Sequence, residues 1–184
     1  MRVIKLGGSL SHSSALTRCM ESVNRDYREH AVVIVPGGGA FADQVRMAQR
    51  HWRFDERTAH DMAVLAMQQM ARMFKALQPD WRLADSVADI AVSAAPGLAT
   101  IWSPQISELD RAGIAASWDV TSDSLAAWLA ARLPAKELIL VKSASIPASV
   151  TIEELQAQHI IDPAFHHYRE SGDFTLSIKN QQQF

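Results

Sequence analysis

Short apolar runs alternate along the chain with longer segments whose apolar residues recur at helical spacing. Residues 3–6 and 31–35 are mostly β-branched or apolar, and both runs lead into glycines. A more polar segment with helical spacing, residues 13–29, separates them. Runs that are apolar on both faces are typical of buried parallel strands, so this stretch predicts a β-α-β unit.

The rest of the chain continues this alternation. Further strands are predicted at residues 99–102, 137–141 and 174–178, and further helices at residues 40–50, 55–77, 107–113 and 122–133. Thr151 and Glu154 stand in the register of a capping box and predict one more short helix. No repeat, low-complexity segment or linker divides the series. We therefore expect one α/β domain over residues 1–184, a three-layer α-β-α sandwich with an open, mainly parallel sheet.

The longest predicted helix, residues 55–77, is rich in methionine. Met62, Met70 and Met73 recur at helical spacing, and methionine often fills gaps in a core because its side chain is flexible. The helix also carries more apolar surface than a small sheet covers. We therefore expect self-association through it, as a homodimer or a larger homo-oligomer.

Composition narrows the class of protein. Apolar residues make up 48% of the chain, enough for a sizeable core. The 18 basic and 20 acidic residues give a formal charge of −2, which disfavours nucleic-acid or membrane binding but permits a small anionic ligand. The single cysteine, Cys19, cannot form an intramolecular disulfide, and no export signal or long apolar run is present. These features predict a cytoplasmic protein.

Candidate chemistry gathers in three short segments. Residues 5–9 read KLGGS, residues 36–39 read PGGG and residues 118–124 read WDVTSDS. In a parallel α/β sheet, ligands bind outside the carboxyl ends of the strands, where we expect all three segments to emerge. The segments are therefore candidates for one site.

The glycines and Lys5 point to a phosphate ligand. Paired glycines after a strand let backbone N–H groups approach an oxyanion, although a tight turn needs glycine equally. A lysine inside an apolar strand is costly to bury without an anionic partner, although its stem could pack on the sheet while the ammonium reaches solvent. The chain has neither the spacing of a P-loop nor the motifs of protein kinases.

The segments VIKLGGSL, VVIVPGGGAFADQVR and WDVTSDSLAAWLAARL, followed by ELILVKS, occur in this order from residue 3 to about residue 143. Together they resemble the motifs of the amino acid kinase superfamily, which includes acetylglutamate kinase, aspartokinase and bacterial UMP kinase. The resemblance implies a phosphotransferase that uses ATP with Mg²⁺ on the ATP phosphates and needs no metal site of its own. It also divides the chain into an acceptor and phosphate part, about residues 1–117, and a nucleotide part, about residues 118–184.

The resemblance assigns roles at the first two strand ends. Lys5 would hold the transferring phosphoryl group, while N–H groups of Gly7 and Gly8 would bind its oxygens. Ser9, Gly37 and Gly38 complete the implied phosphate-binding set, and Gly39 belongs to the acceptor side.

Further roles fall on the later segments. Asp123 matches the aspartate that orients lysines, and Asp119 and Thr121 would contact the acceptor, although both aspartates could instead cap a helix. UMP kinases carry an aspartate at the position of His60, so a uridine acceptor is disfavoured. His60 could bind another acceptor or lie on a helix surface. The implied nucleotide-binding residues are Lys142 and Ser143, although Lys142 could also be a solvated surface lysine.

The WDVTSDSLA segment and the short chain are most similar to small kinases of methanofuran biosynthesis. These enzymes phosphorylate an (aminomethyl)furanmethyl phosphate, so the resemblance implies that a small phosphorylated compound is the acceptor. Two alternatives stay open: a kinase for a small carboxylate or another phosphomonoester, and a non-catalytic ligand-binding or partner subunit. The second is considered because the usual Asp-Gly turn after ELILV is missing and the nucleotide part is short.

Overall fold

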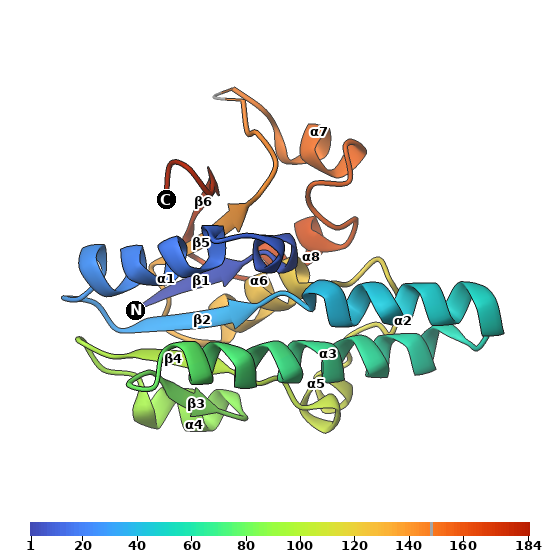
Figure 1. Cartoon of the computed structure of the whole chain (residues 1–184), viewed down its shortest axis with the longest axis horizontal. Coiled ribbons are helices and arrows are strands. Elements are labelled where there is room, and N and C mark those ends of the chain that lie inside the picture. The colour runs from blue at the N-terminus through green and yellow to red at the C-terminus, as the bar shows by residue number, and fades with distance from the viewer. Residues whose placement is uncertain (148) are drawn as a thin grey trace.

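A six-stranded parallel sheet forms the centre of the structure, a computed structural model that describes residues 1–147 and 149–184 (Figure 1). The strands are β1 (Arg2–Leu6), β2 (Val32–Pro36), β3 (Arg82–Ala84), β4 (Ala99–Trp102), β5 (Glu137–Lys142) and β6 (Thr175–Asn180). Their order in the sheet is β3-β4-β2-β1-β5-β6, and each neighbouring pair is parallel. The predicted α/β class is confirmed.

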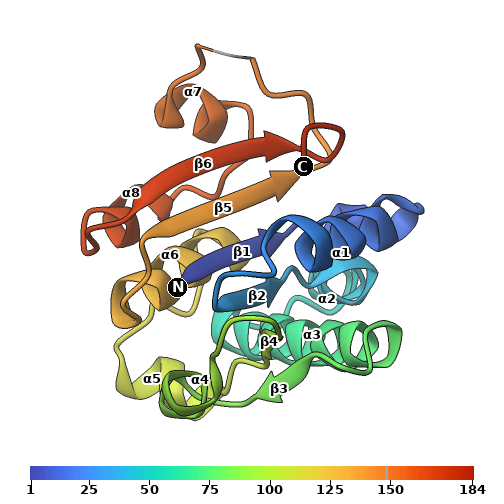
Figure 2. The same cartoon turned by 90° about the vertical axis from the view of Figure 1, so that its left-hand side faces the viewer.

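Helices cover both faces of this sheet (Figure 2). They are α1 (Ala15–Asp26), α2 (Gly39–Trp52), α3 (Glu56–Leu77), α4 (Val87–Ser93), α5 (Ile106–Arg111), α6 (Ser122–Arg132), α7 (Ile152–Ala157) and α8 (Phe165–Arg169), with a short 3₁₀ helix at Gly8–His12. Side chains of α1 and of the C-terminal part of α3 pack on one face, and those of α4, α6 and α8 pack on the other, where Val64 and Met67 of α3 join them. The three predicted layers are therefore present.

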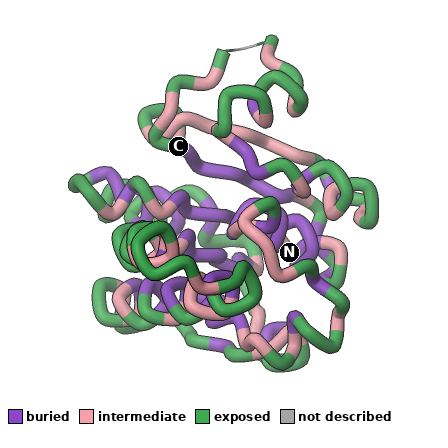
Figure 3. Tube along the Cα trace, turned by 90° about the vertical axis from the view of Figure 1, so that its right-hand side faces the viewer, coloured by how far each residue is buried: buried purple, intermediate pink, exposed green. Residues whose placement is uncertain are grey.

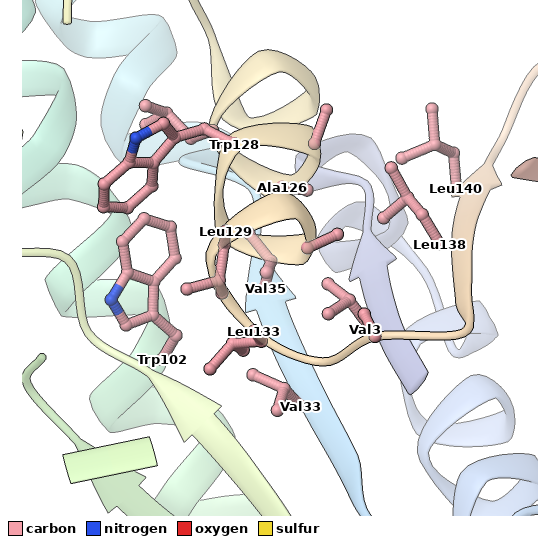
Figure 4. Packing of buried hydrophobic residues seen from close by; sticks show 14 of the residues in the cluster. Val3, Val33, Val35, Trp102, Ala126, Trp128, Leu129, Leu133, Leu138 and Leu140 are labelled. Atoms are coloured by element: carbon pink, nitrogen blue, oxygen red, sulfur yellow. The ribbon is translucent and has the colours of Figure 1, made fainter. Parts of the chain in front are cut away.

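Alternation along the strands explains the two cores. On β1, Val3 faces the α6 side and Ile4 faces the α1 side, because successive side chains of a strand point to opposite faces. On the α6 side, the rings of Trp102 and Trp128 lie 5.9 Å apart (Figure 4). The strands β1, β2, β4 and β5 are mostly buried, the edge strand β6 is mostly half-buried, and the outer faces of the helices are exposed (Figure 3). Lys5 follows Val3 by two positions, so it also faces α6.

The predicted elements are found at or near their expected positions, and the capping box is confirmed. Thr151 accepts a hydrogen bond from the Glu154 N–H at 3.2 Å, and the Glu154 side chain accepts one from the Thr151 N–H at 2.8 Å. The sequence analysis did not predict β3, α4 or α8.

The methionine-rich helix α3 is partly a core helix. Of the three methionines named above, Met70 is buried, in agreement with the gap-filling interpretation, and Met62 and Met73 are half-buried. Leu65 and Leu77 are 46% and 49% exposed. Self-association through α3 stays a prediction. No helix in residues 1–147 and 149–184 has the length and apolar character needed to cross a membrane.

Candidate active site

The two glycine turns lie at the same end of the sheet and touch each other. A Cβ atom added to Gly8 would lie 2.4 Å from the Gly39 nitrogen, and one added to Gly37 would lie 2.4 Å from the Gly8 nitrogen. Real Cβ atoms do not approach backbone this closely, so only hydrogen fits at these positions. The strand ends of β1 and β2 are thus joined backbone to backbone, as a single site requires.

Alanine at either contact should destabilise the fold. We expect Gly8→Ala and Gly37→Ala each to lower the free energy of unfolding by about 3 kcal/mol, the upper end of overpacking costs, because backbone must move. Gly97→Ala is the control: its φ is +91° but its added methyl meets no atom, so strain alone should cost about 1 kcal/mol. Urea unfolding measures all three. Equal transition midpoints for Gly8→Ala and the control would contradict the close contact.

The N–H groups of two glycines are already used by the sheet. Gly7 donates to the Val141 carbonyl at 3.1 Å, and Gly37 donates to the Leu6 carbonyl at 2.9 Å. The ladder of hydrogen bonds thus continues one residue past each strand, and the predicted donation from Gly7 to a phosphate would require its N–H to leave or share the bond to Val141. Within the described residues, the N–H groups of Gly8, Gly38 and Gly39 have no such partner. The group of free donors is thus shifted one residue along each turn.

Two lysines share one buried carboxylate beside these turns. Lys5 Nζ lies 2.9 Å from Asp123 Oδ1, in an ion pair that lacks the angles of a hydrogen bond. Lys142 Nζ donates to Asp123 Oδ2 at 2.5 Å and to the Ile160 carbonyl at 2.5 Å. Lys5 and Lys142 come from neighbouring strands, and Asp123 lies in the first turn of α6, which packs on them. This cluster carries one net positive charge.

The burial of Lys5 and Lys142 excludes the alternative that either lysine is exposed to solvent. The exposed fractions are 5% for Lys5, 3% for Asp123 and 7% for Lys142, so neither lysine is a solvated surface residue. Burial alone would raise the pKa of Asp123, but the ammonium groups of Lys142 and Lys5 outweigh it and lower this pKa to about 2. Burial lowers the pKa of Lys142 to about 8, against the attraction of Asp123.

A second aspartate, Asp162, takes the capping role that the sequence analysis allowed for Asp119 or Asp123. It accepts hydrogen bonds from the N–H groups of Thr121 at 2.9 Å and Ser124 at 3.0 Å, and from both hydroxyls. Burial and the nearby Asp123 raise the pKa of Asp162. Asp162 therefore fixes the start of α6 and, with it, the position of Asp123.

Two hollows adjoin the cluster. The first, which we call the glycine pocket, has a volume of about 210 Å³ and includes Gly8, Gly38, Gly39 and His60 in its lining. The second, the lysine cleft, has a volume of about 660 Å³ and includes Lys5, Asp119, Asp123 and Asp162. The residues that line both are Ser9, Arg46, Trp118 and Thr121. Ligands in the two hollows would therefore meet at this shared boundary.

The remaining predicted site residues are distributed around these hollows. His60 is 7% exposed, so it is not a surface histidine, and burial lowers its pKa despite the Ser117 carbonyl. Ser9 Oγ and Ser143 Oγ share a hydrogen bond of 2.8 Å that links the ends of β1 and β5. Lys142 contacts Asp123 but lines neither hollow. Gly7 and Gly37 also line neither hollow.

The sequence analysis missed Arg46, Trp118 and Asp162. Arg46 and Trp118 lie within quoted segments, but nothing in their spacing showed that the guanidinium would stack on the indole. In the described parts of the chain, no group of three or more His, Cys, Asp or Glu side chains could hold a metal ion. Mg²⁺ carried on ATP phosphates stays a prediction.

Comparison with known proteins agrees with this architecture. A curated relative, [5-(aminomethyl)furan-3-yl]methyl phosphate kinase of Methanocaldococcus jannaschii, is 25% identical over 141 residues, which is 76% of this chain and 64% of the relative. The aligned segment is thus slightly less than two thirds of that protein.

Solved structures share the fold at lower identity. UMP kinase from Ureaplasma parvum is 16% identical with a TM-score of 0.69, covering 97% of this chain and 88% of that one. Uridylate kinase from Archaeoglobus fulgidus is 18% identical with a TM-score of 0.63, covering 98% and 92%. Aspartate kinase from Synechocystis is 14% identical with a TM-score of 0.67, covering 99% and 38%.

A family profile covers most of the chain. The profile described as "Amino acid kinase family" matches residues 1–145, which include the glycine turns, Lys5, Asp123 and Lys142. The chain therefore belongs to the amino acid kinase family.

Proposed function

We propose that the chain transfers the γ-phosphoryl group of ATP to an anionic oxygen of a small acceptor. The observation that carries this proposal is the buried Lys5–Asp123–Lys142 cluster beside the free N–H groups of the glycine turns. Such a donor set, with one net positive charge, suits a polyphosphate. Phosphoryl transfer needs mainly alignment and charge neutralisation, which this arrangement offers.

The proposed step forms one bond and breaks one. The acceptor oxygen attacks the γ-phosphorus, the bond from that phosphorus to the β,γ-bridging oxygen breaks, and the electron pair leaves with ADP. Lys5 and the N–H groups of Gly8 and Gly38 would neutralise the charge on the transferring group. Mg²⁺ on the ATP phosphates would supply further positive charge. Asp123 would hold Lys5 in position while Lys142 holds Asp123.

The low pKa of Asp123 favours an acceptor that is already ionised. With a pKa of about 2, this carboxylate is too weak a base to deprotonate an alcohol efficiently. A phosphomonoester carries about −1.5 to −2 charges at pH 7 and needs no base. A phosphate or carboxylate acceptor therefore fits the cluster better than a neutral hydroxyl.

The best candidate acceptor is [5-(aminomethyl)furan-3-yl]methyl phosphate, the compound named for the curated relative. The glycine pocket supports a small acceptor, since its volume of about 210 Å³ lies below the range of about 300–1,000 Å³ common for drug-sized ligands. Incubation of the protein with this compound and Mg-ATP should give ADP and a diphosphate ester. ³¹P NMR measures the formation of both products. UMP is the comparison substrate. ATP binding without transfer to any phosphate or carboxylate acceptor would instead favour the non-catalytic alternative.

Activity should fall as the pH rises through about 8. Lys142 has a lowered pKa of about 8 in the folded chain, against an ordinary 10.5, so its charge is present below pH 8 and is lost above it. That loss would remove the net positive charge of the cluster, so kcat/KM should decline on the alkaline side.

The same group affects stability in the opposite direction. Between about pH 8 and 10.5 the unfolded chain binds more protons at Lys142 than the folded chain does, so the contribution of Lys142 to the free energy of unfolding should rise with pH.

The control variant is Lys142→Arg, because an arginine keeps its charge above pH 8. The alkaline decline should move to higher pH in this variant, measured as kcat/KM over pH 6–10. An unchanged decline would assign it to another group.

A further inference from the structure

Arg46 is a charged side chain at the boundary between the glycine pocket and the lysine cleft. It lies on α2, and its guanidinium carbon is 3.7 Å from the centre of the Trp118 ring. Trp118 is itself held, because its Nε1–H donates to Gln49 Oε1 at 2.6 Å. The indole thus gives the guanidinium a fixed support by a cation–π contact.

The guanidinium has no anionic partner in the described part of the chain. No hydrogen bond or ion pair of Arg46 occurs among residues 1–147 and 149–184, whereas Arg57, for example, pairs with Asp61 and Asp110. The nearby Asp43 carboxylate instead lies 3.8 Å from His12 Nε2. Arg46 is half-buried, and burial lowers its pKa. A partly desolvated guanidinium with its five donors unused is therefore available for a ligand.

The position of Arg46 identifies which part of a ligand it would meet. In the proposed function, the transferring phosphoryl group would lie between Lys5, which lines the lysine cleft, and the N–H groups of Gly8 and Gly38, which line the glycine pocket, and the body of a small acceptor would fit the glycine pocket. The attacking group must then lie where the hollows join. Of the four residues that line both hollows, Ser9, Trp118 and Thr121 are uncharged and Arg46 is the cation.

We propose that Arg46 binds the phosphate group of the acceptor at this junction and selects phosphorylated acceptors over their alcohols. The inference rests on the proposed function and names the residue that would set its acceptor class. A planar guanidinium can donate two parallel hydrogen bonds to a phosphate, which fixes both its distance and its orientation. Arg46 would leave one phosphate oxygen directed at the γ-phosphorus in the cleft.

Steady-state kinetics test the role of Arg46. Arg46→Met should raise KM for the acceptor by about 10-fold to 100-fold, the loss expected for hydrogen bonds to a charged group, and should change KM for ATP less than threefold. Arg46→Lys keeps the positive charge but cannot donate two parallel hydrogen bonds to one phosphate, so it should give an intermediate KM for the acceptor. Arg50→Met, an exposed arginine one turn further along α2, is the matched control and should behave like the wild type. An acceptor KM unchanged in Arg46→Met would overturn the proposal.

Binding without ATP separates this proposal from the proposed function. Isothermal titration uses [5-(aminomethyl)furan-3-yl]methyl phosphate and the corresponding alcohol. The wild type should bind the phosphate at least tenfold more tightly, and Arg46→Met should lose that preference. If Arg46 only supports Trp118, both ligands should weaken equally, and the proposal fails. A wild type that shows the preference but transfers no phosphoryl group would refute the proposed function and leave the role of Arg46 intact; no preference in the wild type would overturn that role.

Discussion

Replacing Lys5 by alanine should lower kcat by about a hundredfold to a thousandfold, the typical cost of removing one well-placed electrostatic donor. The side chain is buried at the end of β1, 2.9 Å from Asp123 and beside the glycine turns. If Lys5 meets charge that grows in the transition state, its loss should reduce kcat more than it weakens ATP binding. Steady-state kinetics and titration with Mg-ATP measure the two effects separately.

The partner of Lys5 provides a test of coupling. Asp123→Asn keeps the shape but removes the charge that holds both lysines, so it too should lower kcat. Because Lys5 and Asp123 would act as a unit, the double variant should be little worse than the poorer single variant. Additive losses would refute the orienting role of Asp123. Lys136→Ala, at an exposed lysine one residue before β5, is the control, and equal activity in Lys5→Ala and this control would favour the non-catalytic alternative.

Asp162→Ala should be among the most destabilising single substitutions in this chain. The carboxylate accepts hydrogen bonds from two backbone N–H groups and two hydroxyls at the start of α6. Its removal leaves these donors without a partner in a buried place, so we expect a loss of about 2–4 kcal/mol in the free energy of unfolding. Urea unfolding followed by circular dichroism gives this value.

Asp162→Asn separates the loss of the acceptor from the loss of the charge. Burial and Asp123 raise the pKa of Asp162, which means that its negative charge is itself costly in the fold. Asparagine retains one acceptor oxygen without the charge, so its loss of stability should be smaller than that of alanine. Asp173→Ala, at an exposed aspartate, should cost little. An Asp162→Ala variant as stable as this control would show that the cap contributes nothing.

The sequence predicted those elements that leave a clear local pattern, either a continuous apolar run or a helical period. Strands β1, β2 and β5 are buried on both faces and therefore appear as apolar runs. β3 has three residues, two of them exposed, which is too short and too polar for a clear signal. Helix α4 did carry one local signal, because Ser86 caps it by accepting from the Asp89 N–H at 3.1 Å. Its seven residues were too few to show a period.

The site was predictable where one strand end carries the chemistry and not where distant segments meet. Lys5, the glycine turns and Asp123 lie in compact motifs. Asp162 reaches Ser124 across 38 positions, so no local pattern links the cap to its helix. The use of the Gly7 N–H by Val141 depends on the pairing of β1 with β5, which the order of elements along the chain does not reveal.

The place of β1 in the sheet has a consequence for the order of folding. One edge of β1 pairs with β2, the next strand in the chain. Its other edge pairs with β5, which follows β3 and β4 in the chain. Until residues 137–142 dock, β1 keeps an open edge, the kind of surface that promotes aggregation. Such long-range parallel pairing is slow. The same docking event brings Lys142 to Asp123 and Lys5, so the charged cluster can form only once β5 has paired with β1.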